Sequence, residues 1–201
     1  IRFASSSILS VREERLVATS EGSLIKQTFY RINPSVNITA ISADGSDFQT
    51  RSAVIEPAGR GYEYVMGLEL SGNASRWAEE AAMKLEATPV EPGKWDLVLH
   101  PSNLWLTIHE SIGHPTELDR ALGYEANYAG TSFATMDKLQ AHFQYGSDKV
   151  NIVADKTQPG SLGAVAYDDE GVKTKKWDLI RDGKLVGYQA IRDQVHIEGK
   201  K

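Results

Sequence analysis

The 201-residue sequence contains no cysteine, so neither a disulfide nor a thiolate metal ligand can form within it. Basic residues are not in excess either, since 22 lysines and arginines against 27 acidic residues give a formal net charge of -5. Nucleic acids and anionic membranes select basic surfaces, so we expect neither as a partner. The sequence also has no apolar run near the roughly 20 residues that a membrane helix needs. The lack of cysteine fits a reducing compartment, which we take to be cytoplasmic.

Neither end of the sequence resembles the natural end of a protein. The first residues lack the basic segment and the apolar core of a secretory signal peptide, and they also lack an initiator methionine. The last residues are charged and provide no obvious helix cap. We therefore interpret the chain as a piece of a longer protein.

Apolar and polar residues alternate through most of the first third, which is typical of strands with one buried face. Residues 8–18 are predicted to form a strand, a polar turn and a second strand. Residues 22–32 and 36–55 continue the alternation, with Asp44-Gly45 as a hairpin signal. The pattern predicts an antiparallel β-meander that is covered on one side.

The period changes at residues 73–87, where Trp77 and other apolar residues share one helical stripe and Asn73 is a candidate N-cap. Two prolines and a glycine within residues 88–93 then indicate a boundary. The pattern beyond it predicts a strand at 94–100, a helix at 104–114, a strand at 149–155 and a hairpin at 177–191. This order of elements predicts an α+β fold with mainly antiparallel β-sheet and a few helices.

The predicted helix at 104–114 carries a His-Glu-x-x-x-His motif formed by His109, Glu110 and His114. A catalytic zinc takes three protein ligands and keeps an open position for water, and neutral imidazoles are suitable ligands. A carboxylate next to the metal can accept the proton of the attacking water. This chemistry suggests the two histidines as metal ligands and Glu110 as the base. We expect the apolar run before His109 to be buried and to hold that side chain still.

The spacing of the motif requires a distorted helix. Four α-helical positions rotate by about 400°, whereas five rotate by about 500° and leave His109 and His114 roughly 140° apart. Both side chains reach one metal only if the helix bulges or ends between them. We expect the helix to stop at Gly113, because glycine relaxes the backbone and Pro115 disfavours helical angles at His114. The residues alone leave two interpretations open, a metal site and a polar patch of structural histidines.

An acidic pair, Glu117 and Asp119, follows the motif. These carboxylates could orient an imidazole from behind or replace a missing ligand, and we favour the simpler interpretation that they cap a helix or are solvated. The small residues and tyrosines of residues 123–134 either line a cleft for an extended peptide or form a connector with buried tyrosines. The remaining histidines are expected to be structural or surface residues: His100, His142 and His196.

Three stretches of the sequence resemble the TldD/PmbA family of zinc metalloproteases. They are HESIGHPTELD at 109–119, the run at 150–195 with its DDEG turn and LIRDGKLVGY hairpin, and REERLVATSEGSLIKQTFYRI at 12–32. Together they cover most of the chain, and their combination is more specific than the histidine motif alone. Where the family often has glycine after the second histidine, this sequence has Pro115.

The resemblance implies a zinc-dependent peptidase in which His109 and His114 bind zinc. Zinc-bound water, activated by Glu110, would then hydrolyse peptide bonds in unfolded or flexible polypeptides. The resemblance also implies that residues 1–92 are the C-terminal part of the family's N-terminal α+β domain and that residues 93–201 begin its metalloprotease domain.

Two further expectations come from the same resemblance. Family members take a third zinc ligand from a cysteine near their far C-terminus, and this chain has no cysteine. We therefore expect these 201 residues alone to be inactive or impaired, and zinc to be absent or weakly held. The family works as dimers, which implies a homo- or heterodimer with a family member. The alternative function is a non-catalytic partner or scaffold subunit of such a dimer, without bound metal.

Overall fold

The computed structural model describes residues 1–197, which fall into two units. Unit 1 contains Ile1–Asp96 together with Pro159–Ala164, and unit 2 contains Leu97–Gln158 together with the chain from Val165 onward. The elements of unit 1 are β1 (Phe3–Ala18), β2 (Leu24–Ile41), β3 (Phe48–Ser52), α1 (Glu63–Met66), α2 (Leu70–Met83) and the 3-10 turn η1 (Lys84–Glu86). The elements of unit 2 are the 3-10 turn η2 (Pro101–Asn103), α3 (Trp105–Ile108), the π-helical turn η3 (His109–Gly113), the 3-10 turn η4 (His114–Thr116), α4 (Leu118–Ala121), α5 (Met136–Gln140), β4 (Ile152–Asp155), β5 (Lys176–Arg181), β6 (Lys184–Leu185) and the 3-10 turn η5 (Arg192–Gln194).

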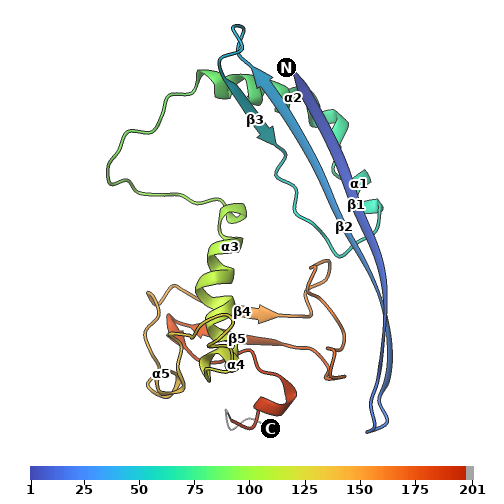
Figure 1. Ribbon diagram of the computed structural model, residues 1–201, viewed down its shortest axis with the longest axis vertical. Coiled ribbons are helices and arrows are strands. Elements are labelled where there is room, and N and C mark those ends of the chain that lie inside the picture. Colours follow the sequence, from blue (N-terminus) through green and yellow to red (C-terminus); the bar gives the residue numbers. More distant parts are fainter. Residues whose placement is uncertain (198–201) are drawn as a thin grey trace. The chain divides into compact units, whose positions relative to one another are not determined.

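A long antiparallel hairpin of β1 and β2 forms most of the sheet of unit 1 (Figure 1). The two strands pair continuously from Phe3 opposite Thr39 to Ala18 opposite Leu24, and β3 pairs with the other edge of β2. The connection between β2 and β3 contains the predicted Asp44-Gly45 turn, with Gly45 at a φ of 74°. The predicted β-meander is therefore confirmed.

Residues 12–15 continue β1, so the polar turn predicted within residues 8–18 is wrong. The charged side chains of this stretch find partners along the sheet. Glu13 forms ion pairs with Arg15 at 2.8 Å and with Arg31 of β2 at 2.5 Å. Hydrogen bonds from Arg15 and Arg31 hold the pKa of the Glu13 carboxyl below its ordinary value. Because the charges are paired across the strands, the polar stretch does not have to leave the sheet.

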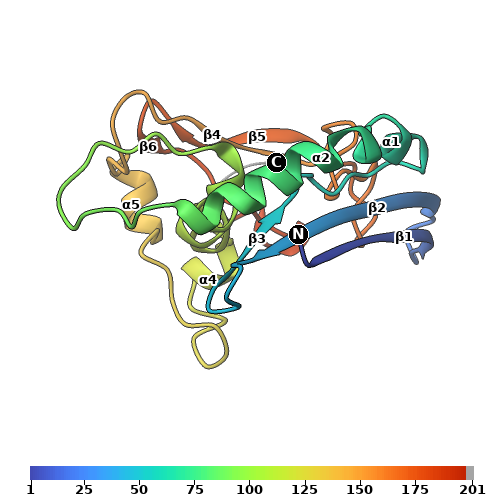
Figure 2. The ribbon, with the colours of Figure 1, turned by 90° about the horizontal axis from the view of Figure 1, so that it is seen from above.

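Helix α2 covers one face of this sheet, and Figure 2 shows it on one side of the hairpin. Trp77 and Ala81 of the predicted apolar stripe are buried against Ile38 and Ala40 of β2. The helix begins at Leu70, earlier than predicted, so Asn73 is not its N-cap. The Asn73 amide instead lies within the first turn and donates to the carbonyl of Glu69 at 3.2 Å.

The core of unit 2 forms between the antiparallel sheet β4–β5–β6 and the segment that carries the histidine motif. The predicted hairpin is present, with Asp182 and Gly183 at φ angles of 50° and 74° between β5 and β6. The buried core residues are Ile112, Leu118, Ala134, Leu179, Ile180, Leu185 and Tyr188. Two of these residues, Ile112 and Leu118, flank the end of the motif, so the same core that stabilises the sheet also fixes the motif.

The strand predicted at residues 94–100 is wrong, because this stretch pairs with no strand among residues 1–197. Its apolar residues are exposed, and Val98 is fully accessible. Alternation alone cannot produce a strand where no partner supplies the ladder of hydrogen bonds.

The α+β class with antiparallel sheets is confirmed. Among residues 1–197 no helix is both long enough and apolar enough to cross a bilayer.

Candidate metal centre

The histidine motif lies on a helix that widens instead of ending. Helix α3 passes directly into the π-helical turn η3, and the backbone N–H of His114 donates to the carbonyl of His109, five residues back. Gly113 and His114 both keep right-handed helical angles, with His114 at φ -62° and ψ -46°. The prediction that the helix stops at Gly113 is therefore wrong, and the alternative of a bulge is correct. In a π-helical turn the fifth residue after a given one lies above it on the same face, as the fourth residue does in an α-helix. His114 therefore lies above His109.

Pro115 takes part in this distortion without ending the helix at His114. It occupies the first turn of η4, where a missing N–H is tolerated. Proline cannot donate the hydrogen bond that would continue an α-helical pattern, and distortions of this kind are common just before it. The chain leaves helical geometry only at Glu117, whose ψ is 121°.

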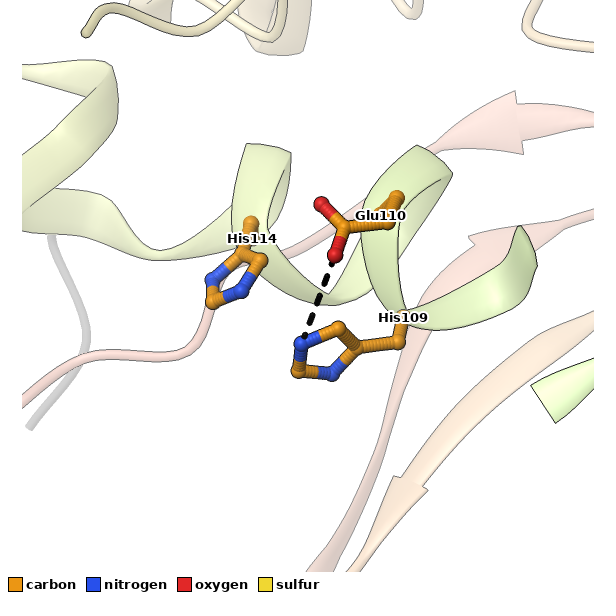
Figure 3. Close-up of side chains that lie close together, drawn as sticks. All are labelled: His109, Glu110 and His114. Carbon is orange, nitrogen blue, oxygen red and sulfur yellow. Dashed lines mark ion pairs between the residues drawn. The ribbon is translucent and has the colours of Figure 1, made fainter. Parts of the chain in front are cut away.

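The widened turn brings the three predicted site residues together. The imidazole rings of His109 and His114 lie with their centroids 4.3 Å apart and their planes at 70°. Figure 3 shows the two rings facing one another and the Glu110 carboxylate beside them, with one oxygen 3.9 Å from His109 Nε2. Each residue offers one ligand atom, and all three atoms lie within 4.8 Å of one another.

The site is open to solvent. The side chains of His109 and Glu110 are 51% and 62% exposed, whereas His114 is 30% exposed. The apolar run before the motif, which we expected to be buried, is also exposed, with Trp105 at 66% and Ile108 at 46%. That expectation is wrong, because α3 presents these side chains to solvent while the buried contacts begin only at Ile112.

The end of the motif is fixed by the neighbouring Thr116 and by Gln189, which is distant in the sequence. Thr116 is fully buried, and its hydroxyl donates to the carbonyl of Ile112 at 2.6 Å. The Gln189 amide donates to the carbonyl of Gly113 at 2.6 Å and to Thr116 Oγ1 at 3.2 Å. Backbone bonds between residues 116–118 and Gln189 add a short parallel bridge. Neither Gln189 nor Thr116 was predicted as part of the site, and the only signal in the sequence was that Gln189 lies near the end of the predicted hairpin at 177–191.

The acidic residues after the motif differ in what they contact. Glu117 stands at the N-cap of α4, yet its side chain makes no capping hydrogen bond with the described residues. Its Oε1 instead lies 3.0 Å from His114 Nδ1. Asp119 accepts from the backbone N–H of Arg120 at 2.9 Å, within the first turn of α4. Neither carboxylate therefore caps α4 from its N-cap position: Asp119 bonds to the backbone inside the first turn, and Glu117 contacts His114.

The other candidate features are exposed. Tyr124 and Tyr128 in the loop of residues 123–134 are 71% and 94% exposed, so the interpretation of a connector with buried tyrosines is wrong. The remaining histidines lie on the surface as predicted: His100, His142 and His196.

The donor set of the motif fits a zinc ion. Two imidazoles and a carboxylate are borderline-soft and hard ligands of the kind that zinc accepts. The two imidazole rings already lie close together, and the side chains of His109 and Glu110 are open to solvent. His109 and His114 are the residues that would hold the metal, with Glu110 next to it.

The sequence matches the PmbA/TldA metallopeptidase C-terminal domain family over residues 92–201. A curated metalloprotease of Methanocaldococcus jannaschii is 30% identical over 194 residues, which are 96% of this chain and 40% of that protein. A curated metalloprotease of Synechocystis is 30% identical over 187 residues, which are 92% of this chain and 37% of that protein. The chain therefore spans about two fifths of the length of these relatives.

Two solved structures share the fold. A Thermotoga maritima protein described as a candidate modulator of a DNA gyrase superposes with a TM-score of 0.69 at 18% identity, over 98% of this chain and 41% of that one. TldE from Thermococcus kodakarensis superposes with a TM-score of 0.58 at 21% identity, over 98% of this chain and 41% of that one. At these identities the superpositions carry information on the fold alone.

Proposed function

Because this chain belongs to the TldD/PmbA family of metallopeptidases, we propose that it carries the core of a zinc-dependent peptidase centre. The observation that supports the proposal most directly is the π-helical turn η3. This turn brings the imidazoles of His109 and His114 together despite their irregular spacing, with the Glu110 carboxylate next to them. A polar patch of structural histidines would not need a rare helical turn to bring the two rings together.

In the proposed site His109 and His114 would hold zinc, and Glu110 would act as the base beside them. Bound zinc supplies Lewis acidity, which makes water a nucleophile near neutral pH. The Glu110 carboxylate accepts one proton from the water as its oxygen attacks the carbonyl carbon of the peptide bond. The same carboxylate then delivers that proton to the amide nitrogen as the carbon–nitrogen bond breaks. The high exposure of Glu110 suits this role, because the carboxylate must reach water and substrate in turn.

A catalytic zinc normally has three protein ligands, and the motif offers two in addition to the base. The resemblance to the family implies a cysteine as the third ligand, and this chain contains none. We place that ligand in the part of the protein beyond these 201 residues. The chain alone would then bind zinc weakly and show little or no hydrolysis. We likewise assign residues 1–92 to the end of the N-terminal domain and residues 93–201 to the start of the metalloprotease domain.

We propose unfolded or flexible polypeptides as substrates and a dimer with a second copy or a family member as the working form. The exposure of the Glu110 side chain supports the choice of substrate, because an extended polypeptide can approach an exposed carboxylate directly. For the proposed dimer, the likeness to TldE supports no more than a shared fold. Light scattering on the full-length protein measures the mass, and a monomeric mass at micromolar concentration contradicts the dimer.

Substitution of Glu110 by glutamine tests the peptidase proposal. Glutamine keeps the shape of the side chain but cannot accept a proton, so we expect kcat to fall by about 10²- to 10⁴-fold while zinc content stays near that of the wild type. The measurements are cleavage of an unstructured fluorogenic peptide by the full-length protein and zinc content by mass spectrometry. Asp148→Asn, at an exposed position of unit 2, is the control for loss of one negative charge.

Two results of this experiment would contradict the proposal. Full activity of Glu110→Gln would show that another group transfers the proton. A full-length wild-type protein without zinc and without cleavage would favour the alternative of a scaffold subunit.

A further inference from the structure

A line of polar contacts leads away from the proposed zinc ligand His114. The Nδ1 atom of its imidazole lies 3.0 Å from Oε1 of Glu117. The other carboxylate oxygen of Glu117 lies 3.4 Å from Nε of Arg120, and Arg120 Nη2 lies 3.1 Å from Oε2 of Glu125. The network therefore runs from the histidine through one carboxylate and one guanidinium to a second carboxylate.

These contacts decide which nitrogen of His114 carries the proton in the neutral imidazole. An ionised carboxylate can only accept a hydrogen bond, whereas a guanidinium can only donate one. Nδ1 has one neighbour of each kind, Glu117 Oε1 at 3.0 Å and Arg120 Nη2 at 3.5 Å. The shorter contact favours a proton on Nδ1 that is donated to Glu117. The lone pair needed for a metal then lies on Nε2.

Glu117 is itself held in place by the fold and by Arg120. The Leu118 N–H that follows it donates to the carbonyl of Gln189 at 2.8 Å, which fixes the backbone at the end of η4. The Arg120 side chain is only 16% exposed and also donates to the carbonyl of Ala129 at 3.3 Å. A guanidinium held at several points is a firm anchor for the carboxylate that contacts His114.

The same acidic residues do not form a second cation site. One carboxylate oxygen from each of Glu117, Asp119 and Glu125 lies within 4.8 Å of the others. The Arg120 guanidinium, however, forms ion pairs with two of these carboxylates and supplies the positive charge that a metal ion would otherwise bring. The cluster is therefore better explained as support for a neighbouring group.

We propose that Glu117, anchored by Arg120, is a positioning residue that fixes the ring orientation and the tautomer of His114, so that Nε2 is presented to the metal. This inference rests on the proposed function of the motif as a zinc site. Carboxylates that accept from the distal nitrogen of a ligating histidine typically change metal affinity or activity by about 10- to 100-fold when removed. We expect an effect of that size for Glu117.

The test uses the full-length protein with three substitutions and two readouts. Glu117→Ala removes the acceptor, Glu117→Gln keeps an acceptor oxygen without the charge, and Asp119→Ala removes a charge of the same cluster whose oxygen bonds to a backbone N–H instead of to His114. Zinc affinity is measured by competition with a chelator. The tautomer of His114 is read in the metal-free protein at about pH 8 from long-range proton–nitrogen correlations of ¹⁵N-labelled histidine.

We expect the wild type to show His114 protonated on Nδ1 and to bind zinc about 10- to 100-fold more tightly than Glu117→Ala. Glu117→Gln should lie between the two, and Asp119→Ala should stay within about threefold of the wild type. In Glu117→Ala the tautomers of His114 should mix. A change in tautomer is not produced by a general loss of stability, so this readout separates positioning from a structural role.

Two results overturn the inference while leaving the peptidase proposal intact. One is unchanged zinc affinity and an unchanged tautomer in Glu117→Ala. The other is an equal loss of affinity in Asp119→Ala, which would show an effect of cluster charge instead of the contact with His114. If the wild type binds no zinc, the proposed function itself fails, and the metal-free tautomer still reports whether Glu117 accepts from His114.

Discussion

The substitution Thr116→Val tests whether the buried polar contacts around Thr116 hold the end of the motif in its widened turn. Valine has nearly the same shape as threonine, so the substitution removes the hydroxyl without leaving a large cavity. Thr116 is fully buried, and its hydroxyl bonds to the carbonyl of Ile112 and accepts from the Gln189 amide. Loss of a buried partner leaves polar groups without compensation, which costs about 1–3 kcal/mol. We expect the free energy of unfolding to fall by that amount.

Urea denaturation followed by circular dichroism measures this loss, provided that the slope of the transition stays constant. Thr131→Val, at an exposed loop position, is the matched control, and we expect it to change stability by less than about 0.5 kcal/mol. The substitution Gln189→Met removes the same contact from the other side. Because both residues belong to one network, the double variant should lose less than the sum of the single losses, with a coupling of about 0.5–1 kcal/mol.

Equal stability of Thr116→Val and the control would refute a role of the hydroxyl, because it would then contribute nothing that valine cannot replace. Additive losses in Thr116→Val and Gln189→Met would refute the shared network. Additivity would mean that the two side chains act independently, and the end of the motif would have to be fixed by the apolar packing of Ile112 and Leu118 and by the backbone bonds to Gln189.

Two further predictions concern the turns of the two sheets. The Ser42 hydroxyl and the Ser46 N–H and hydroxyl donate to Asp44 and lower the pKa of its carboxyl from 3.8 to about 2. The contribution of Asp44 to stability is therefore complete above pH 3.8 and is lost as the pH falls toward 2. A carboxyl titration by NMR with a midpoint near 4 would contradict this. Gly183 has a φ of 74°, and a Cβ there would collide with the carbonyl oxygens of Gly146 and Ser147. In Gly183→Ala the strained backbone alone should cost about 1–3 kcal/mol of stability, and the collision should add to that loss. The control is Gly123→Ala, since Gly123 has a similar φ of 83° but faces open space; equal losses of stability in urea denaturation would remove the collision as a cause.

The parts of the fold that could be predicted from the sequence are those that depend on short-range chemistry. Asp182-Gly183 supplies the positive φ angles of a two-residue hairpin turn wherever it occurs between alternating strands, and the structure contains that hairpin. Residues 12–15 and 94–100 were predicted wrongly for the opposite reason. Whether a charged run stays in a strand, or an alternating run becomes one, depends on partners elsewhere in the chain.

The candidate site likewise has one part that the local sequence predicts and another that depends on distant residues. The residue types and the spacing predicted that His109 and His114 can meet only through a distorted helix, and the structure brings them together. The kind of distortion was not predictable from the local sequence, because Pro115 disfavours the helical angles that His114 adopts. The contacts that hold those angles come from Thr116 and from Gln189, far along the chain. Local preference at His114 is overridden by tertiary hydrogen bonds.

The widened turn and the contact with Glu117 depend on each other. If the helix had stopped at Gly113, His114 would leave helical geometry, and a residue three positions later would no longer lie beside its ring. Because His114 keeps helical angles and η4 follows at once, one side of its imidazole faces His109 while Nδ1 faces Glu117. The one-residue insertion relative to a His-Glu-x-x-His helix therefore has two consequences. It places His114 across from His109 through a bond to the fifth residue, and it keeps His114 within reach of the carboxylate that can orient it.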